Sequence, residues 1–313
     1  MPPSTALITG ASGFVGSAVA RMALARGMAV RAMVRESSRL DLLRDVPAEA
    51  IVRGDMTDAA SLASAVQGAA AVVHCAATTS EMAPDLALSR RINVEGTETL
   101  LAACRKAGVR RFINISSQSA HADNPSVYGR TKTEQDERVR AAPGVDWTIL
   151  KPSIIYGGEA KGIFAKMVRL CRRLPVIPII GPGHEEMRPI HVDDVAWAVL
   201  ACLQEPRTIG RTYDLGGADV VEFNDFVGEI LKALGRQAFR FHLPIPVALA
   251  AAKTLSLVMK NPPLTPDNVT GIQRVRRVDI GDAERDFGFH PRSFAQGLRQ
   301  SLSPEPGQGE GFS

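Results

Sequence analysis

The start of the chain carries the feature that most constrains its fold: a short apolar segment runs into three glycines and then into an alanine-rich stretch. It reads Thr5-Ala-Leu-Ile-Thr-Gly10-Ala-Ser-Gly13-Phe-Val-Gly16. A strand, a glycine-rich turn and a helix in this order bind the pyrophosphate of a dinucleotide, because the helix N-terminus directs unpaired N–H groups at the phosphates. Gly10 permits the tight turn, Gly13 admits the pyrophosphate close to the backbone, and Gly16 lets the helix pack on the strand. We predict a dinucleotide site and a helix over residues 14–26, the alternative being a glycine-rich turn without a ligand.

Short apolar segments alternate with helical ones beyond this turn. Strands are predicted at residues 6–9, 29–34, 50–52, 71–74, 111–116 and 147–150. This alternation predicts an α/β fold, a doubly wound parallel sheet of the Rossmann type with a smaller C-terminal substrate lobe. We expect a dinucleotide-binding core over residues 1–157. Residues 158–302 are expected to form mainly the substrate lobe with returning core elements, among them a helix at 192–204 and a strand at 212–215. The polar, Gly- and Pro-rich residues 303–313 are expected to be a disordered tail.

Composition narrows the class of protein. The chain has 313 residues, 45% of them hydrophobic, and a net charge of +4. No basic run with interleaved aromatic residues is present, so we expect a small-molecule substrate and no nucleic-acid partner. The cysteines are isolated, with no histidine at metal-ligand spacing, so we expect reduced, mostly buried thiols and no metal. No basic leader precedes the first apolar segment and no apolar run reaches membrane-spanning length, so we expect a cytoplasmic protein.

The end of the second predicted strand bears on which dinucleotide binds. A site for NAD usually has an acidic residue there, which accepts a hydrogen bond from the ribose 2′-hydroxyl. This chain has Val34 at that position and Arg35 next, whose planar cation suits a 2′-phosphate. We therefore favour NADP over NAD. Two alternatives stay open: Arg35 caps a surface loop with Glu36, or Glu36 faces the ribose.

Two carboxylates follow the third predicted strand in Gly54-Asp-Met-Thr-Asp58. A carboxylate at this place can meet the amino group of adenine, and a carboxylate directly before a helix can also cap it. We assign Asp55 to the adenine and Asp58 to the N-cap of a helix at residues 59–66.

The candidate chemistry lies in Tyr128-Gly-Arg-Thr-Lys132. Helical residues four apart share a face, so the phenol and the ammonium can point into one site. A cation near a phenol lowers the pKa of the phenol and makes Tyr128 a usable general acid or base. Ser117 follows the predicted fifth strand, whose carboxyl end faces the ligand crevice, and its hydroxyl can hold a substrate oxygen. The alternative is purely structural: serines that end a strand, and a tyrosine that covers apolar surface.

With these features, the sequence resembles the short-chain dehydrogenase/reductase superfamily, in its extended and atypical branch of NAD(P)-dependent epimerases, dehydratases and reductases. The resemblance covers about residues 6–302. The motifs that carry it are Thr9-Gly-Ala-Ser-Gly-Phe-Val-Gly16, Gly54-Asp-Met-Thr-Asp58, Val73-His-Cys-Ala-Ala77, Asn93-Val-Glu-Gly-Thr97, Ser116-Ser117, Tyr128 to Lys132, Leu150-Lys-Pro-Ser-Ile-Ile-Tyr-Gly157 and Ile190-His-Val-Asp-Asp-Val195.

The resemblance implies roles for individual residues. Tyr128 would be the catalytic acid or base, Ser117 would orient the substrate, and Lys132 would also bind the nicotinamide ribose. Pro152 would line the nicotinamide. The remaining cofactor-binding residues implied by these motifs are Gly10, Ser12, Gly13, Phe14, Val15, Gly16, Asp55, Met56 and Ala76, with Arg35 added from the argument above.

Within the superfamily the sequence is most similar to bacterial relatives of the dehydrogenase-like accessory subunit of respiratory complex I. This likeness rests on three features: the short gap between Ser117 and Tyr128, the segment Leu243-Pro-Ile-Pro-Val-Ala-Leu-Ala, and the C-terminal motif Phe287-Gly-Phe-His-Pro-Arg. Sugar-nucleotide epimerases usually have a longer loop between the catalytic serine and tyrosine, and an arginine where this chain has Lys151. Both departures count against a nucleotide-sugar substrate.

Three functions remain open at this stage. The first is an oxidoreductase that acts on a carbonyl or alcohol of a lipophilic molecule, which the apolar segments after residue 158 favour. The second is an epimerase or dehydratase that takes the same hydride and returns it. The third is a non-catalytic NADPH-binding regulatory or assembly protein. Arg188 and His191 are the tentative substrate residues. The apolar segment at 243–259 is expected to cover a pocket or a subunit contact, as in a homodimer, rather than a membrane surface.

Overall fold

The computed structural model describes residues 5–79, 85–158, 163–259, 269 and 277–302, so the predicted tail at 303–313 lies outside the described residues. The chain forms two compact units. The first comprises Met1–Ser153, Val192–Gly216 and Asp279–Pro291. The second comprises Ile154–His191, Gly217–Val278 and Arg292–Ser313.

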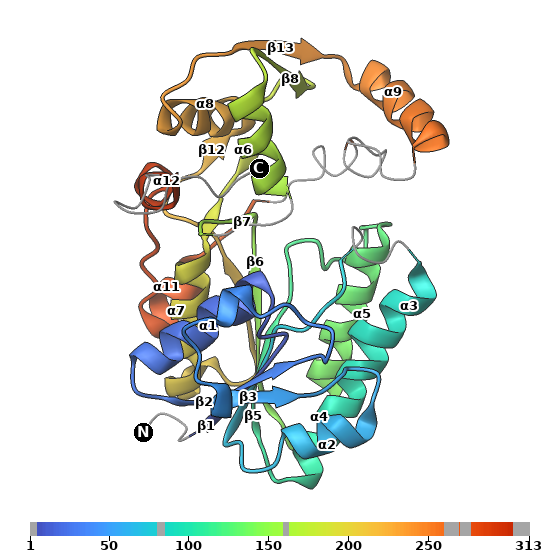
Figure 1. Ribbon diagram of the computed structural model, residues 1–313, viewed down its shortest axis with the longest axis vertical. Coiled ribbons are helices and arrows are strands. Elements are labelled where there is room, and N and C mark those ends of the chain that lie inside the picture. Colours follow the sequence, from blue (N-terminus) through green and yellow to red (C-terminus); the bar gives the residue numbers. More distant parts are fainter. Residues whose placement is uncertain (1–4, 80–84, 159–162, 260–268, 270–276, 303–313) are drawn as a thin grey trace. The chain divides into compact units, whose positions relative to one another are not determined.

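A seven-stranded parallel sheet forms the centre of the first unit (Figure 1). Its order is β11-β6-β5-β4-β1-β2-β3, which confirms the predicted doubly wound fold. The strands are β1 (Thr5–Thr9), β2 (Ala29–Val34), β3 (Ile51–Arg53), β4 (Ala71–His74), β5 (Arg111–Ile115), β6 (Asp146–Pro152) and β11 (Arg211–Leu215). The strand order reverses between β1 and β4, and ligands of such sheets bind at the carboxyl ends of the strands at this point.

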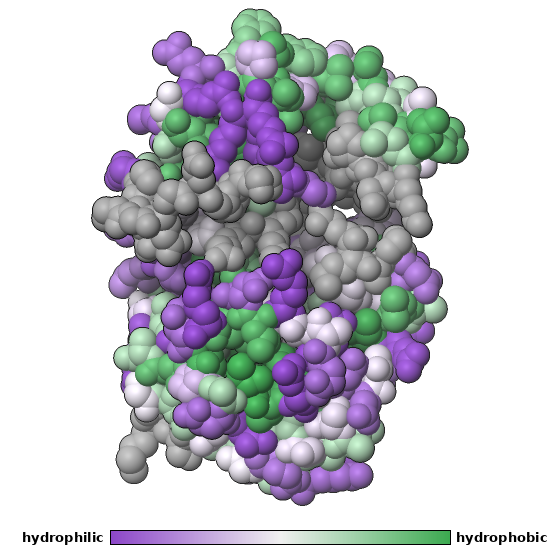
Figure 2. Space-filling model, viewed as in Figure 1, coloured by the Kyte–Doolittle hydropathy of each residue, from purple (hydrophilic) through white to green (hydrophobic). Residues whose placement is uncertain are grey.

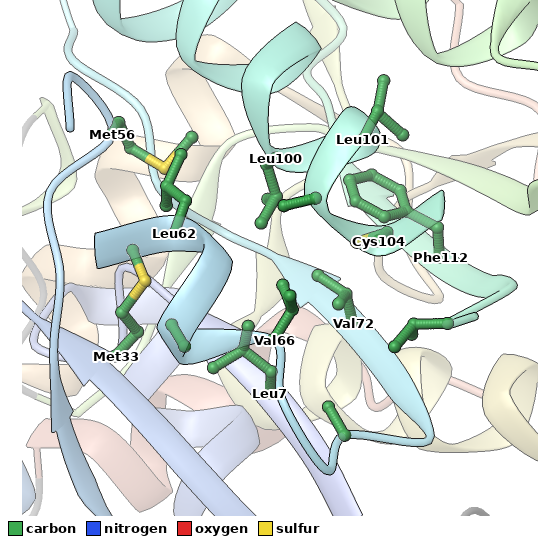
Figure 3. Packing of buried hydrophobic residues seen from close by; sticks show 14 of the residues in the cluster. Leu7, Met33, Met56, Leu62, Val66, Val72, Leu100, Leu101, Cys104 and Phe112 are labelled. Carbon is green, nitrogen blue, oxygen red and sulfur yellow. The ribbon is translucent and has the colours of Figure 1, made fainter. Parts of the chain in front are cut away.

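Helices cover both faces of this sheet (Figure 1). On one face lie α2 (Ala59–Ala65), α3 (Leu86–Arg90), α4 (Gly96–Lys106) and α5 (Val127–Ala141); on the other lie α1 (Phe14–Ala25) and α7 (Val192–Gln204), with α11 (Gly281–Phe287). Figure 3 shows the core between the sheet and the first set, where Leu7, Val72 and Phe112 face Leu62 and Leu100. All five side chains are at most 1% exposed, so this core fixes the strands that carry the site.

The glycine turn is shaped by backbone contacts that leave no room for side chains. Gly10 has φ +64°, and a Cβ there would lie 2.7 Å from the backbone of Ala76. A Cβ at Gly16 would lie 2.3 Å from the carbonyl oxygen of Gly10. Only glycine fits either place, because a β-carbon would overlap backbone that cannot move aside. The predicted roles of Gly10 in the turn and of Gly16 in packing are confirmed.

The second unit has its own core of aromatic side chains, with Tyr156 packed edge-on against Phe294 and Phe226 stacked on Phe294. Its helices are α6 (Ile163–Arg173), α8 (Phe223–Ala233), α9 (Ile245–Val258) and α12 (Phe294–Leu302). Its strand pairs are β7 (Ile155–Tyr156) with β10 (Ile190–His191), β9 (Glu186–Met187) with β12 (Val221–Glu222), and β8 (Val176–Ile180) with β13 (Phe239–Leu243). Among the described helices of the whole chain, none combines the length and the apolar composition that crossing a membrane requires.

The boundaries of most predicted elements lie within two residues of the observed ones, but β13 and the two-residue strands β7, β9, β10 and β12 were not predicted. The residues of β13, Phe239-Arg-Phe-His-Leu243, alternate apolar and basic side chains, which indicates a half-buried strand. The structure exposes both phenylalanines, so the usual burial of the apolar side does not apply here. The four cysteines are free thiols, three of them buried, as expected.

Candidate functional site

The N-terminus of α1 forms the first part of the site. Gly13 is its N-cap residue, and no described side chain caps the helix there. The first turn also contains no acidic residue. Its N–H groups, which have no acceptor inside a helix, are therefore available together with the positive end of the helix dipole. Ser12, Phe14 and Val15 are partly accessible around this turn. The geometry fits the pyrophosphate of a dinucleotide.

Two arginines lie at the ends of β2 and β3, where the adenosine of the dinucleotide is predicted to bind. Arg35 is exposed directly after β2, and its N–H donates to Ser38 Oγ at 3.1 Å. Arg53 ends β3 beside Val34; its Nη1 donates to the carbonyl of Arg35 at 3.0 Å, and its Nε lies 3.7 Å from the carboxylate of Glu36. Arg53 was not among the residues predicted from the sequence. The feature that could have identified Arg53 is its position at the end of β3, the strand next to β2.

Asp55 and Asp58 have different hydrogen-bond partners. Asp58 accepts a hydrogen bond from the N–H of Ala60 at 3.0 Å, which confirms it as the N-cap of α2. Asp55 accepts from the N–H and the hydroxyl of Thr57 at 2.8 and 2.7 Å. These hydrogen bonds, with the charges of Arg35 and Arg91, hold the pKa of Asp55 below its usual value. Its contact with adenine stays a prediction.

Three further predicted residues lie at strand ends or in the connections that follow them. The N–H of Ala76 donates to Thr9 Oγ1 at 3.2 Å. Met56 is buried, and its carbonyl would lie 2.7 Å from a Cβ at Gly96, so α4 passes close to this loop. Pro152 is buried at the end of β6. Their contacts with a dinucleotide stay predictions.

The structure brings Ser117 and Tyr128 together. Helix α5 begins after Ser126, whose Oγ accepts from the N–H of Gly129 at 3.0 Å, and this places Tyr128 in the first turn. The hydroxyl of Ser117 accepts a hydrogen bond from the N–H of Ser119 at 3.1 Å, and it lies near enough to the phenol of Tyr128 to act on the pKa of that phenol. The neighbouring Ser116 is buried and instead donates to Asp136 at 2.8 Å. The two serines therefore differ in their partners: Ser116 interacts with Asp136, and Ser117 is the one that acts on the phenol.

The expected lowering of the phenol pKa is wrong for this structure. Burial raises the pKa of Tyr128 to about 12, because it disfavours the phenolate, and the hydrogen bond from Ser117 only partly opposes this. The charge of Asp136 adds to the rise. Tyr128 is therefore protonated at neutral pH and can donate its proton.

The ammonium of Lys132 is held by groups other than the phenol. Lys132 is 1% exposed, and its Nζ donates to the carbonyl of Ile115 at 2.7 Å and to Oε1 of Gln135. Burial lowers the pKa of Lys132 to about 8, against the attraction of Asp136. The spacing of four residues predicted the shared helix face but not these partners.

A buried network extends from Lys132 to the first strand. Gln135 Nε2 contacts His74 Nε2 and Thr97 Oγ1, each at 2.9 Å. His74 Nδ1 lies 2.7 Å from Thr9 Oγ1. Because the amide nitrogen of Gln135 can only donate, the Nε2 atom of a neutral His74 accepts and the Nδ1 atom of His74 carries the proton toward Thr9. Burial, and to a lesser extent the charge of Lys132, lowers the pKa of His74 to about 3.

The sequence analysis assigned no role to His74, Gln135 or Asp136. His74 and Thr97 stood in quoted motifs, whereas Gln135 and Asp136 were visible only as the residues three and four after Lys132. Asp136 is buried, accepts from Asn114 Nδ2 at 3.0 Å and lies 3.5 Å from the ammonium of Lys151. Burial raises the pKa of this carboxyl.

Arg188 and His191, the tentative substrate residues, both lie in the second unit. Arg188 donates to the carbonyls of Gly217, Val278 and Ala218 at 2.7, 3.1 and 3.3 Å. His191 is buried, with Nε2 3.1 Å from Ser301 Oγ. These contacts join segments of the second unit, and a role in substrate binding stays a prediction for both residues.

Comparison with known proteins supplies the family. The model of the NAD dependent epimerase/dehydratase family matches residues 6–216. The UDP-glucose 4-epimerase of Vibrio cholerae is 24% identical over 96% of this chain and 94% of its own. A 4-hydroxy-2-methyl-3-oxo-4-farnesyl-3,4-dihydroquinoline-1-oxide ketoreductase of Stigmatella aurantiaca is 28% identical over 78% of each chain. The crystal structure of the dTDP-glucose 4,6-dehydratase of Streptomyces venezuelae, with NAD bound, superposes with a TM-score of 0.73, at 25% identity over 95% of each chain.

The chain belongs to the NAD dependent epimerase/dehydratase family. It is an enzyme of the NAD(P)-dependent class that contains epimerases, dehydratases and reductases, as the sequence resemblance implied. The likeness to the complex I accessory subunit is found as well: the mitochondrial NADH dehydrogenase [ubiquinone] 1 alpha subcomplex subunit 9 of Arabidopsis thaliana is 27% identical over 82% of this chain and 65% of that subunit.

Proposed function

We propose that this enzyme is an NADP(H)-dependent reductase of a carbonyl group on a lipophilic small molecule. The observation that carries the proposal is an arrangement of residues: Ser117 follows β5, while Tyr128 lies in the first turn of α5, one turn before the buried Lys132. The phenol of Tyr128, whose pKa burial raises further, is protonated at neutral pH. A protonated phenol beside a second hydroxyl is suited to hold a carbonyl oxygen and to protonate it.

The reaction follows from these positions. The two hydroxyls donate hydrogen bonds to the carbonyl oxygen, which polarises the C=O bond. A reduced nicotinamide dinucleotide, held at the glycine turn of Gly10, Gly13 and Gly16, would supply the hydride for the new C–H bond. As the C=O π electrons move onto oxygen, Tyr128 gives its proton to the developing alkoxide, a stronger base than phenolate, and the product is an alcohol. The ammonium of Lys132, one helical turn after Tyr128, is fixed by Ile115 and Gln135.

The cofactor preference is proposed from the adenosine end. Arg35 follows Val34 without a carboxylate at the strand end, while Arg53 lies beside the carboxylate of Glu36. Two cations near the end of β2 favour a 2′-phosphate over a 2′-hydroxyl.

Arg35→Ala is therefore expected to weaken NADP(H) binding by roughly tenfold to a hundredfold, through loss of a charge-assisted contact of about 1.5 to 3 kcal/mol. NAD(H) affinity should change little. Titration of both cofactors by fluorescence checks this, with Arg39→Ala as the control, since Arg39 pairs with Asp41 on the exposed loop at 2.8 Å. A wild-type preference for NAD, or equal weakening of both cofactors, contradicts the proposal.

The substrate class is tested by a turnover screen of NADPH with hydrophobic ketones and NADP⁺ with hydrophobic alcohols, beside UDP- and GDP-sugars. We expect an apolar ketone to be reduced, with cofactor released on dilution. The ketoreductase relative, whose name contains a farnesyl group, supports this choice.

The epimerase relative and the family description favour one competing function, the conversion of a nucleotide-sugar with return of the hydride. Selective turnover of a nucleotide-sugar, with dinucleotide retained through purification and denaturation, would establish that function and exclude the reductase.

A further inference from the structure

An apolar face lies outward on the strand pair of the second unit. β13 runs parallel to β8 in a register that sets Phe239 opposite Val176 and Phe241 opposite Pro178. These four side chains point to one side, because paired residues of neighbouring strands share a face. The alternate residues of β8 are fully buried on the other side. Phe239 is nevertheless 71% exposed.

Helix α9 extends this face. It contains a single charged residue, Lys253, in fourteen positions. Its fully buried residues Ala248 and Ala252 pack with Ile180 and Leu243, which end the two strands. The other side of the helix and its end are open: Leu257 is 89% and Val258 78% exposed. Figure 2 shows hydrophobic side chains gathered over α9, at the upper right. We name the α9–β13 surface by its members Val176, Pro178, Phe239, Phe241, Val247, Leu257, Val258 and Met259.

The segments that build this surface contain no acidic residue. The sequence has no Asp or Glu between Glu159 and Glu185, which includes α6 and β8, nor between Glu229 and Asp267, which includes β13 and α9. Over the whole chain, 33 acidic residues accompany 37 basic ones, so the separation is local. The basic residues of the two segments are Lys161, Lys166, Arg169, Arg172, Arg173, Lys232, Arg236, Arg240, Lys253 and Lys260.

Basic side chains border the exposed apolar ones. Helix α6 buries its apolar residues in the core of the second unit and ends in Arg172 and Arg173, which are exposed. Leu174 and Val176, 40% and 41% exposed, follow directly. In the sequence, the two basic residues therefore directly precede exposed apolar residues.

We propose that the α9–β13 surface binds the interface of an anionic lipid membrane. Its exposed apolar side chains would enter the boundary between headgroups and acyl chains, and the neighbouring basic residues would meet the lipid phosphates. The alternative partner for this apolar surface is the same surface of a second copy of this chain. A symmetric pair would set the same acid-free, basic segments against each other, which like-charge repulsion disfavours.

The test is co-sedimentation of the full chain with vesicles of phosphatidylcholine alone and of phosphatidylcholine with equimolar phosphatidylglycerol. We expect at least roughly tenfold tighter binding to the anionic vesicles, weakened by added salt. Leu257→Asp with Val258→Asp, and separately Arg172→Glu with Arg173→Glu, should each reduce binding by roughly tenfold or more. Ile209→Asp is the matched control, because Ile209 is a 41% exposed apolar residue of the first unit.

Failure of the wild-type chain to sediment with anionic vesicles overturns the proposal, and this arm needs no variant. An equal loss of binding in Ile209→Asp overturns it as well, since the effect would then not belong to this surface. Light scattering supplies the remaining arm: a dimer that Leu257→Asp dissociates would assign the surface to a second copy and exclude the membrane.

Discussion

Tyr128→Phe is expected to lower turnover of the ketone found in the screen by about a hundredfold to ten-thousandfold. The substitution removes the one proton that the mechanism transfers from the protein and changes little volume. Dinucleotide affinity should stay near the wild-type value, because the phenol is proposed to contact the substrate oxygen. Steady-state kinetics and a cofactor titration on the same preparation check both statements.

Tyr213→Phe is the matched control for this experiment. Tyr213 is buried in the same unit, but its hydroxyl donates to Asp286 at 2.6 Å. Turnover by this variant should remain near the wild-type value after correction for any unfolded fraction. Full activity in Tyr128→Phe, or an equal loss in both variants, would contradict the role assigned to Tyr128.

Acid is expected to destabilise the protein through His74. The pKa of this imidazole is about 3 in the folded chain against 6.5 in an unfolded one. Between these values the unfolded chain binds a proton that the folded chain does not, so the free energy of unfolding falls as the pH drops from about 6.5 to about 3. A shift of this size corresponds to about 5 kcal/mol, comparable with the whole stability of many domains.

Denaturant unfolding of the wild type and of His74→Gln across this pH range measures the contribution. The variant has no proton to take up at this position, so its free energy of unfolding should depend less on pH by a few kcal/mol. His290→Gln, at an exposed position, should keep the wild-type dependence. Parallel pH curves for wild type and His74→Gln would show that His74 does not cause the acid sensitivity.

The fold could be predicted because its signals are local. The alternation of strands and helices and the three glycines need only a few neighbouring residues to be recognised. Asp58 as an N-cap belongs to the same category, since its partner Ala60 is two residues away. β13 was missed because it pairs with β8, a strand distant in the sequence, and no local pattern reveals such a pairing.

The shared helix of Tyr128 and Lys132 was predicted, but the electrostatics of these two residues were not. Spacing placed Tyr128 and Lys132 on one helix, yet the pKa of each depends on burial by segments distant in sequence. The network that holds Lys132 joins Gln135 to His74, which are 61 positions apart. No periodicity connects such residues, because their contact depends on how β4 and α5 pack.

The glycine turn has a consequence for how this enzyme can change. Backbone atoms of the turn, of Ala76 and of α1 touch where Gly10 and Gly16 lie, so any new side chain at these positions would disturb three elements at once. The side chains of Arg35 and Arg53 stand on strand ends outside this contact. If the cofactor binds as proposed, recognition of the phosphates that all nicotinamide dinucleotides share is therefore separated from the choice among these cofactors. Substitutions at the strand ends are then expected to change the cofactor preference, while the backbone contacts of the glycine turn stay the same.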